Sequence, residues 1–471
     1  MIPMPLGEVA AALGSICPPE RANTLAYRVT TDSRDVRQGD LFFAIQGPRF
    51  DGHDFVAAAR ARGAVGAVVA KPGFVAPSSG QECDAFTRIP VADTVKSLAQ
   101  LAGHYRRQVL KAGTIVIAVT GSNGKTTTKS MIDHVLKPYF SGRASPRSFN
   151  NHLGVPLMLL SIDAEDRYAV VEVGMNAPGE IAALAELAAP HVGVITSIGE
   201  AHLEGLGSLE AIAAEKASLL QYIRPSGLAA VNVDRREVDP FLNVRSGIRL
   251  ITFGQNPNAR IRVTNLRGSL SGTTFDIEWR YRAELSLPGF HHATNAAAAF
   301  TVARWFGVAP YEIVARLRTF EAAEGRTRVI KIGPARVVDD SYNANPASVL
   351  AAIAVLGAER PGYRTLVLGD MLELGEESQV LHERVVRAAL EAGIETLVVV
   401  GDRTQVAASR VKPETFATRI VMGADEHAVV EALVPLVAGG HTIWVKGSRA
   451  MMLDRVVRAL TDRFAPRAAV A

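Results

Sequence analysis

Residues 114–127 read TIVIAVTGSNGKTT, an apolar run that passes directly into a turn containing two glycines. A continuous apolar run of this length is typical of a strand buried on both faces of a parallel sheet. We expect a helix over 126–136 to follow the turn and to end before Pro138. The order of strand, glycine turn and helix predicts an α/β fold built around a parallel sheet.

The turn itself predicts a phosphate-binding loop. Gly121 and Gly124 allow backbone amides to approach phosphate oxygens. Lys125 would neutralise the phosphates, and Thr126 offers a hydroxyl for Mg²⁺. The strict pattern G-x-x-x-x-G-K-[ST] is not met, because Val119 stands where its first glycine would be. The prediction therefore depends on the buried strand before the loop and on the helix after it.

Strand-like and helix-like segments alternate along the rest of the chain, which indicates three α/β domains. We predict a small α/β domain at 1–110, a central P-loop ATPase-like parallel-sheet domain at 111–324 and a C-terminal Rossmann-like doubly wound domain at 325–471. The expected strands are 41–45, 64–69, 114–120, 168–173, 192–198, hairpin strands within 263–287, and 336–339, 365–368, 396–400, 419–422 and 442–446. The expected helices include 54–62, 94–110, 208–223 and 293–306.

The composition is that of an ordinary globular protein, with 48% hydrophobic and 21% charged residues among 471. No apolar run approaches the roughly 20 residues of a membrane span, and the N-terminus lacks a signal-peptide pattern, so we expect no membrane insertion. The two cysteines, Cys17 and Cys83, are too few for a disulfide framework and favour a reducing compartment. We therefore expect a cytoplasmic protein.

The formal net charge is +4 and the isoelectric point is about 9.0, yet no dense block of lysine or arginine stands out. We therefore predict no nucleic-acid partner. Dispersed arginines are as compatible with an ordinary solvated surface as with small anionic substrates such as nucleotides.

Two polar residues follow strands of the predicted central sheet, at the edge where ligands bind in such sheets. Glu172 ends one strand, and His202 follows the next. Backbone amides can satisfy such a carboxylate, and an imidazole can cap a helix, but both beside a phosphate loop favour Mg²⁺ coordination. Lys216 lies on the apolar face of the helix predicted over 208–223. Its ammonium could reach water past that face, or it could be buried, neutral and carbamylated.

Longer runs throughout the chain resemble the Mur ligases of peptidoglycan precursor synthesis. The first domain carries DSR at 32–34, GDLFFA at 39–44 and DGH at 51–53, similar to the family's uridine-nucleotide domain. Further similar runs are FNNHLGVP at 149–156, AHLEGLGS at 201–208, DDSYNANP at 339–346, LGDMLELG at 368–375 and VKGSR at 445–449. Within the family, these runs indicate the member that joins D-alanyl-D-alanine to UDP-N-acetylmuramoyl-tripeptide.

The resemblance implies ATP as a substrate, an acyl-phosphate intermediate, two Mg²⁺ ions and a carbamylated Lys216; we also expect a monomer. It further implies residue roles, with Lys125, His202, Lys216 and Arg326 acting in catalysis. The other implied roles are ATP binding by Gly121, Ser122, Asn123, Gly124, Lys125, Thr126, Thr127, Asn295, Arg326 and Asp340; substrate binding by Ser33, Arg34, Asn151, Asn343 and Asn345; and metal binding by Thr126, Glu172, His202 and Lys216.

Each role has an ordinary structural alternative. Asp340 and Asn343 could form a helix cap or an Asx-turn before Pro346, and Arg326 could form a surface salt bridge. The segment 33–34 could be a plain turn, and 446–448 a strand-to-helix cap. One position departs from the family, which usually has asparagine where this chain has His292.

Three functions compete with this assignment. Two are enzymes, a sister ligase that adds a third-position amino acid and a folylpolyglutamate synthase, and the run YNANP at 342–346 disfavours both. The third is a nucleotide-dependent switch or scaffold. If the chain is a ligase, three domains around one site predict an open form that closes on its substrates and excludes water.

Overall fold

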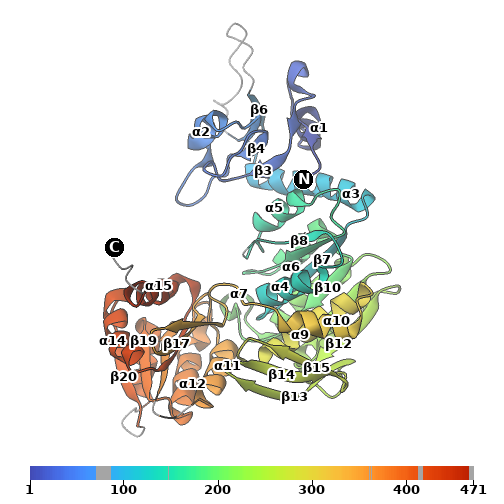
Figure 1. The fold of residues 1–471 in the computed structure, drawn as a ribbon. Helices are drawn as coiled ribbons and strands as arrows, with labels where there is room; N and C mark the ends of the chain where they lie inside the picture. Colours follow the sequence, from blue (N-terminus) through green and yellow to red (C-terminus); the bar gives the residue numbers. More distant parts are fainter. Residues whose placement is uncertain (71–85, 147, 360, 362, 412–416, 466–471) are drawn as a thin grey trace, which may run out of the picture.

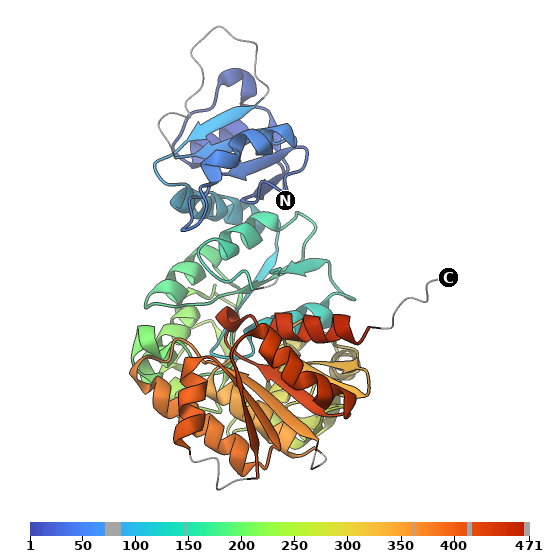
Figure 2. The same ribbon diagram turned by 90° about the vertical axis from the view of Figure 1, so that its left-hand side faces the viewer.

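The computed structural model describes residues 1–70, 86–146, 148–359, 361, 363–411 and 417–465, so Cys83 lies outside the described residues. Three α/β units follow one another along the chain (Figure 1). The central unit lies between the N-terminal unit and the C-terminal unit, and a view turned by 90° shows the same order (Figure 2). The domain boundaries at 110/111 and 324/325 stay predictions.

The N-terminal domain is built on a four-stranded parallel sheet in the order β3-β4-β5-β6. A long helix, α3, leads from it to the central domain and is capped by Asp93, whose side chain accepts hydrogen bonds from two backbone amides. The predicted helix at 54–62 is a 3₁₀ turn followed by α2. The elements are β1 Met4–Pro5, α1 Leu6–Ala12, β2 Leu25–Ala26, β3 Arg28–Thr30, β4 Asp40–Phe43, the 3₁₀ turn Gly52–Phe55, α2 Val56–Ala61, β5 Gly66–Val69, β6 Thr87–Pro90 and α3 Thr94–Lys111.

The central domain contains a nine-stranded sheet in the order β15-β14-β13-β12-β11-β10-β7-β9-β8. It is parallel from β8 to β13, and β13, β14 and β15 form an antiparallel meander, one strand more than the predicted hairpin. Its strands are β7 Ile115–Thr120, β8 Gly142–Ala144, β9 Tyr168–Glu172, β10 Val192–Ile195, β11 Leu228–Asn232, β12 Arg249–Gly254, β13 Ile261–Ser269, β14 Gly272–Ile277 and β15 Tyr281–Leu285.

Helices cover both faces of this sheet, which explains why β7 is apolar throughout. Ile117 and Val119 pack into one core with α4 and α9, whereas Val116 and Ala118 pack into another with α5 and α6. Alternate residues of a strand point to opposite faces, so a strand covered on both sides needs apolar residues at every position. The helices are α4 Lys125–Leu136, α5 Gly154–Ser161, α6 Glu180–Ala188, α7 Leu203–Leu206, α8 Leu209–Ala217, α9 His291–Trp305 and α10 Pro310–Arg318.

The C-terminal domain has a six-stranded sheet in the order β16-β17-β21-β18-β19-β20. The five predicted strands are present and parallel, and the doubly wound fold is confirmed. A sixth strand, β16, is an antiparallel edge strand that was not predicted. The elements are β16 Arg328–Ile332, β17 Ala335–Asp340, α11 Pro346–Gly357, β18 Arg364–Gly369, α12 Ser378–Glu391, β19 Thr396–Val400, α13 Asp402–Arg410, β20 Arg419–Gly423, α14 Glu426–Ala438, β21 Thr442–Lys446 and α15 Asp454–Arg463.

The helix predicted over 208–223 is shorter than expected. Ser208 caps α8 by accepting a hydrogen bond from the backbone of Ala211, but the α-helix ends at Ala217 and a 3₁₀ turn, Ser218–Tyr222, follows. Among the helices that the structure describes, none has the length and apolar character required to cross a bilayer.

Candidate active site

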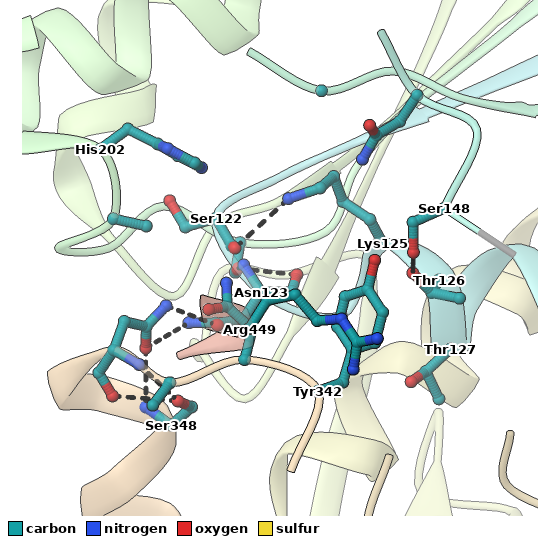
Figure 3. Close-up of a pocket in the computed structure, with 18 of the residues that line it drawn as sticks. Ser122, Asn123, Lys125, Thr126, Thr127, Ser148, His202, Tyr342, Ser348 and Arg449 are labelled. Carbon is teal, nitrogen blue, oxygen red and sulfur yellow. Dashed lines mark hydrogen bonds between the residues drawn. The ribbon is translucent and has the colours of Figure 1, made fainter. Parts of the chain in front are cut away.

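A pocket of about 870 Å³ lies between the central and C-terminal domains. Its walls come from the loop after β7 and from the carboxyl ends of β9, β10, β17 and β21. In parallel α/β sheets this is the edge where ligands bind. Figure 3 shows Ser122, Asn123 and Lys125 of the loop together with Tyr342 and Arg449 of the C-terminal domain around this cavity.

The predicted phosphate loop has the backbone that phosphate binding requires. Gly121 and Gly124 adopt φ values of 149° and 82°, and α4 starts directly after the second glycine. The Lys125 ammonium donates to the carbonyl of Gly121 at 2.7 Å. Burial lowers the pKa of Lys125; Glu172 raises it and Arg326 lowers it further. A phosphate entering the loop would replace the Gly121 carbonyl as the partner of the Lys125 ammonium.

Gly124→Ala is expected to weaken nucleotide binding at least tenfold, about 1.4 kcal/mol. A β-carbon at this position would lie 2.2 Å from Oδ1 of Asn295, so the side chain that closes the loop from α9 would be displaced. Gly113→Ala is the matched control, because Gly113 also has a positive φ of 84° but its β-carbon would meet nothing within 4 Å. Calorimetric titration with ADP measures both. Equal losses in the two variants would show that backbone strain alone is responsible.

Glu172 is the centre of a buried polar cluster beside the loop. Its carboxylate accepts from the Thr126 hydroxyl at 2.9 Å and from the Asn150 amide at 3.0 Å, and it lies 3.4 Å from the Lys129 ammonium. The Glu172 carboxylate is therefore held by side-chain donors and not by backbone amides, which was the ordinary structural alternative for this residue. Asn150 and Lys129 were not predicted as site residues, although Lys129 lies one helical turn after Lys125 on the same face of α4.

The Thr126 hydroxyl and the Glu172 carboxylate fit a magnesium ion. Both are hard oxygen donors, they touch each other, and they lie where the loop would hold phosphates. Mg²⁺ in such sites takes one or two protein oxygens together with phosphate oxygens and water. Across the described residues, no group of three or more His, Cys, Asp and Glu side chains converges as a ready-made metal cage.

The other two predicted metal ligands differ in their surroundings. His202 lines the pocket at the start of α7, and its Nδ1 lies 2.6 Å from the carboxylate of Glu373 in the C-terminal domain, so its ring pairs across the domain interface and does not cap the helix. Lys216 is 1% exposed, so its ammonium does not reach water. Burial, and next the charge of Lys125, lower the pKa of Lys216 well below its usual value. The structure describes Lys216, and this residue is not among those that line the pocket.

The opposite wall belongs to the C-terminal domain. Asp340 accepts from the Lys446 ammonium at 2.7 Å, so Lys446 is a buried ion-pair partner rather than a strand-to-helix cap. The Arg326 guanidinium stacks on the Tyr342 ring at 3.9 Å instead of forming a surface salt bridge. Asn345 caps α11 through Ser348, which is the capping role that the sequence analysis weighed for its neighbours.

Asn123 and Asn345 join the two walls directly. Each donates an amide hydrogen to the other, at 3.3 Å and 2.7 Å, although they lie 222 residues apart in the sequence. A second bridge joins Glu200 to Arg384. The central and C-terminal domains therefore touch at two separate places.

The structure gathers most of the predicted residues but not all of them. Ser33 lies in a turn of the N-terminal domain, and Arg34 pairs there with Asp32 at 2.8 Å, outside the pocket lining. Asn151 lines the pocket and caps the start of α5. Pocket residues that had no predicted role include Ser148, Asn150, His291, His292, Tyr342, Lys446 and Arg449.

Three family models match the chain in sequence order. They are the Mur ligase family, catalytic domain, at 26–106, the Mur ligase middle domain at 119–303, and the Mur ligase, glutamate ligase domain at 325–449. The UDP-N-acetylmuramoyl-tripeptide–D-alanyl-D-alanine ligase of Escherichia coli strain K12 is 36% identical over 442 residues, which cover 92% of this chain and 93% of that protein.

Solved structures agree with the sequence matches. MurF from Acinetobacter baumannii matches with a TM-score of 0.86 and 31% identity, covering 98% of this chain and 99% of that one. MurF ligase from Thermotoga maritima in complex with ADP matches with a TM-score of 0.78 and 27% identity, covering 94% and 98% of the two chains.

Proposed function

This chain belongs to the Mur ligase family, and from that premise we propose that it joins D-alanyl-D-alanine to the terminal carboxylate of UDP-N-acetylmuramoyl-tripeptide. It is an ATP-dependent ligase of peptidoglycan precursor synthesis. The observation that carries the proposal is the pocket, which places a phosphate loop opposite the Asp340–Lys446 pair of a second domain. The two substrates that we propose are those named for relatives that match nearly the whole chain.

The reaction requires two anions to meet. The tripeptide carboxylate attacks the γ-phosphate of ATP and forms an acyl phosphate with release of ADP; the dipeptide amine then attacks the acyl carbon and phosphate leaves. Lys125 and Arg326 are the cations that offset the repulsion between the carboxylate and the triphosphate. Bound Mg²⁺ would neutralise further phosphate charge, with Thr126 and Glu172 holding one ion and His202 and carbamylated Lys216 a second.

The remaining predicted residues divide between the substrates. Asn295 and Asp340 would contact the nucleotide from the two walls, with Gly121, Ser122, Asn123, Gly124 and Thr127 around the phosphates. Ser33 and Arg34 would bind the uridine diphosphate end, and Asn151 the body of the tripeptide substrate. Asn343 and Asn345 are the proposed contacts for the incoming dipeptide.

Phosphate release by the purified protein tests this function. We expect turnover only when ATP, a UDP-linked tripeptide and D-alanyl-D-alanine are all present. A panel of UDP-linked acids with lysine or diaminopimelate at the third position, combined with single amino acids and dipeptides, defines both specificities. Steady ATP hydrolysis without acceptor or amine would favour the switch or scaffold and contradict the ligase.

Substrate binding is expected to draw the N-terminal domain inward. The central and C-terminal domains already touch through Asn123–Asn345 and Glu200–Arg384, whereas Ser33 and Arg34 lie in the domain at the far end of the molecule. A closed site would protect the acyl phosphate from water. Small-angle scattering should show a smaller radius of gyration with the UDP-linked tripeptide and an ATP analogue together. An unchanged radius would contradict closure.

We further propose that the enzyme acts as a monomer in the cytoplasm. The pocket is lined by two domains of the same chain, and the two cysteines favour a reducing compartment. Sedimentation of the purified protein tests the first part.

A further inference from the structure

His292 is a buried histidine that connects the two walls of the pocket. It lies in the first turn of α9, where its side chain is 2% exposed. Its two ring nitrogens face different partners: Nδ1 lies 3.5 Å from the amide nitrogen of Asn295, and Nε2 lies 3.2 Å from the hydroxyl of Thr327. Neither contact follows from the sequence pattern at 289–295.

The chemistry of the partners fixes the direction of these hydrogen bonds. The amide nitrogen of Asn295 can only donate, so Nδ1 of His292 accepts. The hydrogen of a neutral ring then lies on Nε2, which donates to Thr327. The Thr327 hydroxyl can donate onward to Asp340, 3.4 Å away. Burial, followed by the charges of His291 and Lys446, lowers the pKa of His292 well below its usual value, which favours the neutral ring that this pattern requires.

The hydrogen bonds from Asn295 through His292 and Thr327 to Asp340 form one chain. Both of its ends, Asn295 and Asp340, line the pocket in which we propose that the nucleotide binds. At one end, Asn295 lies against the phosphate loop, as the predicted clash with a β-carbon at Gly124 shows. At the other end, Asp340 pairs with Lys446. Thr327 lies between them, just after Arg326, in the segment that joins the central domain to the C-terminal sheet. Its φ of 61° is unusual for a β-branched residue, so the backbone there is held in a specific conformation.

We propose that His292 is a positioning residue for the nucleotide: it orients the Asn295 amide against the phosphate loop and, through Thr327, holds Asp340 on the opposite wall. The proposal rests on the proposed function, in which Asn295 and Asp340 contact the nucleotide. It goes beyond that function because it assigns a role to the position at which this chain departs from the family. A single ring thus couples two contacts that lie on different domains.

Nucleotide affinity is the readout, measured by calorimetric titration with ADP, which requires no ligase turnover. His292→Ala and Thr327→Val are each expected to raise the Kd for ADP about tenfold, because each breaks the same chain of hydrogen bonds. The double variant is expected to lose little more than either single variant, since residues in one network are not additive. The KM for D-alanyl-D-alanine should stay within about twofold, because a loss confined to nucleotide binding leaves the other substrate unaffected.

Two further variants separate positioning from general damage. His134→Ala removes a half-buried histidine at the far end of α4, where Nε2 lies 3.0 Å from the Arg316 carbonyl, and should leave the Kd for ADP unchanged. His292→Asn keeps a donor and an acceptor and should bind ADP more tightly than His292→Ala. If His292→Ala does not fold, Thr327→Val alone carries the test: its Kd for ADP should still rise about tenfold while the KM for the dipeptide stays within about twofold.

An unchanged Kd for ADP in His292→Ala, additive losses in the double variant, or an equal rise in the KM for the dipeptide would each overturn the proposal. Failure of the proposed function has a different signature. In that case the wild-type protein binds ADP but does not release phosphate with the two substrates, while the effects of His292→Ala and Thr327→Val on ADP binding persist.

Discussion

Glu172→Gln is expected to lower kcat at least about a thousandfold, roughly 4 kcal/mol in activation free energy. The carboxylate is 1% exposed and touches the hydroxyl of Thr126 and the amide of Asn150. Glutamine has nearly the same shape but lacks the negative charge that a cation at the phosphates requires. The loss should therefore appear in turnover, measured as phosphate release with saturating substrates.

The alanine variant at the same position separates catalysis from folding. Both variants remove a charged partner of the buried Lys129 ammonium, but Glu172→Ala also removes the oxygens that accept from Thr126 and Asn150, so its melting temperature should fall further than that of Glu172→Gln. Glu186→Ala, on the exposed face of α6, is the control and should behave like the wild type in both assays. Turnover within tenfold of the wild type in either Glu172 variant would refute the metal assignment.

Lys216→Ala is expected to abolish turnover, with partial recovery in the presence of a short-chain carboxylic acid. The side chain is 1% exposed, and burial lowers the pKa of Lys216, which favours the neutral amine that reacts with carbon dioxide. Alanine leaves a space in which a small carboxylate could replace the carbamate oxygens. We expect a loss of at least about a hundredfold and a rescue that saturates with acid concentration.

The control for the rescue is Lys137→Ala, an exposed lysine at the end of α4, which should neither lose activity nor respond to the acid. Full activity of Lys216→Ala without any acid would refute the carbamate. Loss of activity with no rescue, together with an unchanged melting temperature, would also contradict the carbamate. The variant would then be folded, and yet a carboxylic acid would not restore function from the space that Lys216→Ala leaves.

Local patterns were sufficient to predict the fold. The apolar run of β7, the glycines after it and the start of α4 are contiguous in the chain, and the burial of β7 on both faces confirms the parallel sheet. The same holds for the five parallel strands of the last domain. The exceptions include β8, β11 and β12 of the central sheet, which were not predicted. They also include β16, an edge strand that is largely exposed and therefore lacks an apolar pattern, and the early end of α8 at Ala217.

The sequence by itself determined the strand, glycine turn and helix of the predicted phosphate loop, the sheet beneath it and about a third of the residues that line the pocket, because these depend on the chemistry of neighbouring residues. Only the tertiary structure decided how the side chains are partnered. Lys129 and Asn150 around Glu172, the Asn123–Asn345 bridge, and the path from His292 through Thr327 to Asp340 join residues that lie 13 to 222 positions apart. Such contacts leave no periodic signal in the chain, because the packing of sheets and domains brings the partners together.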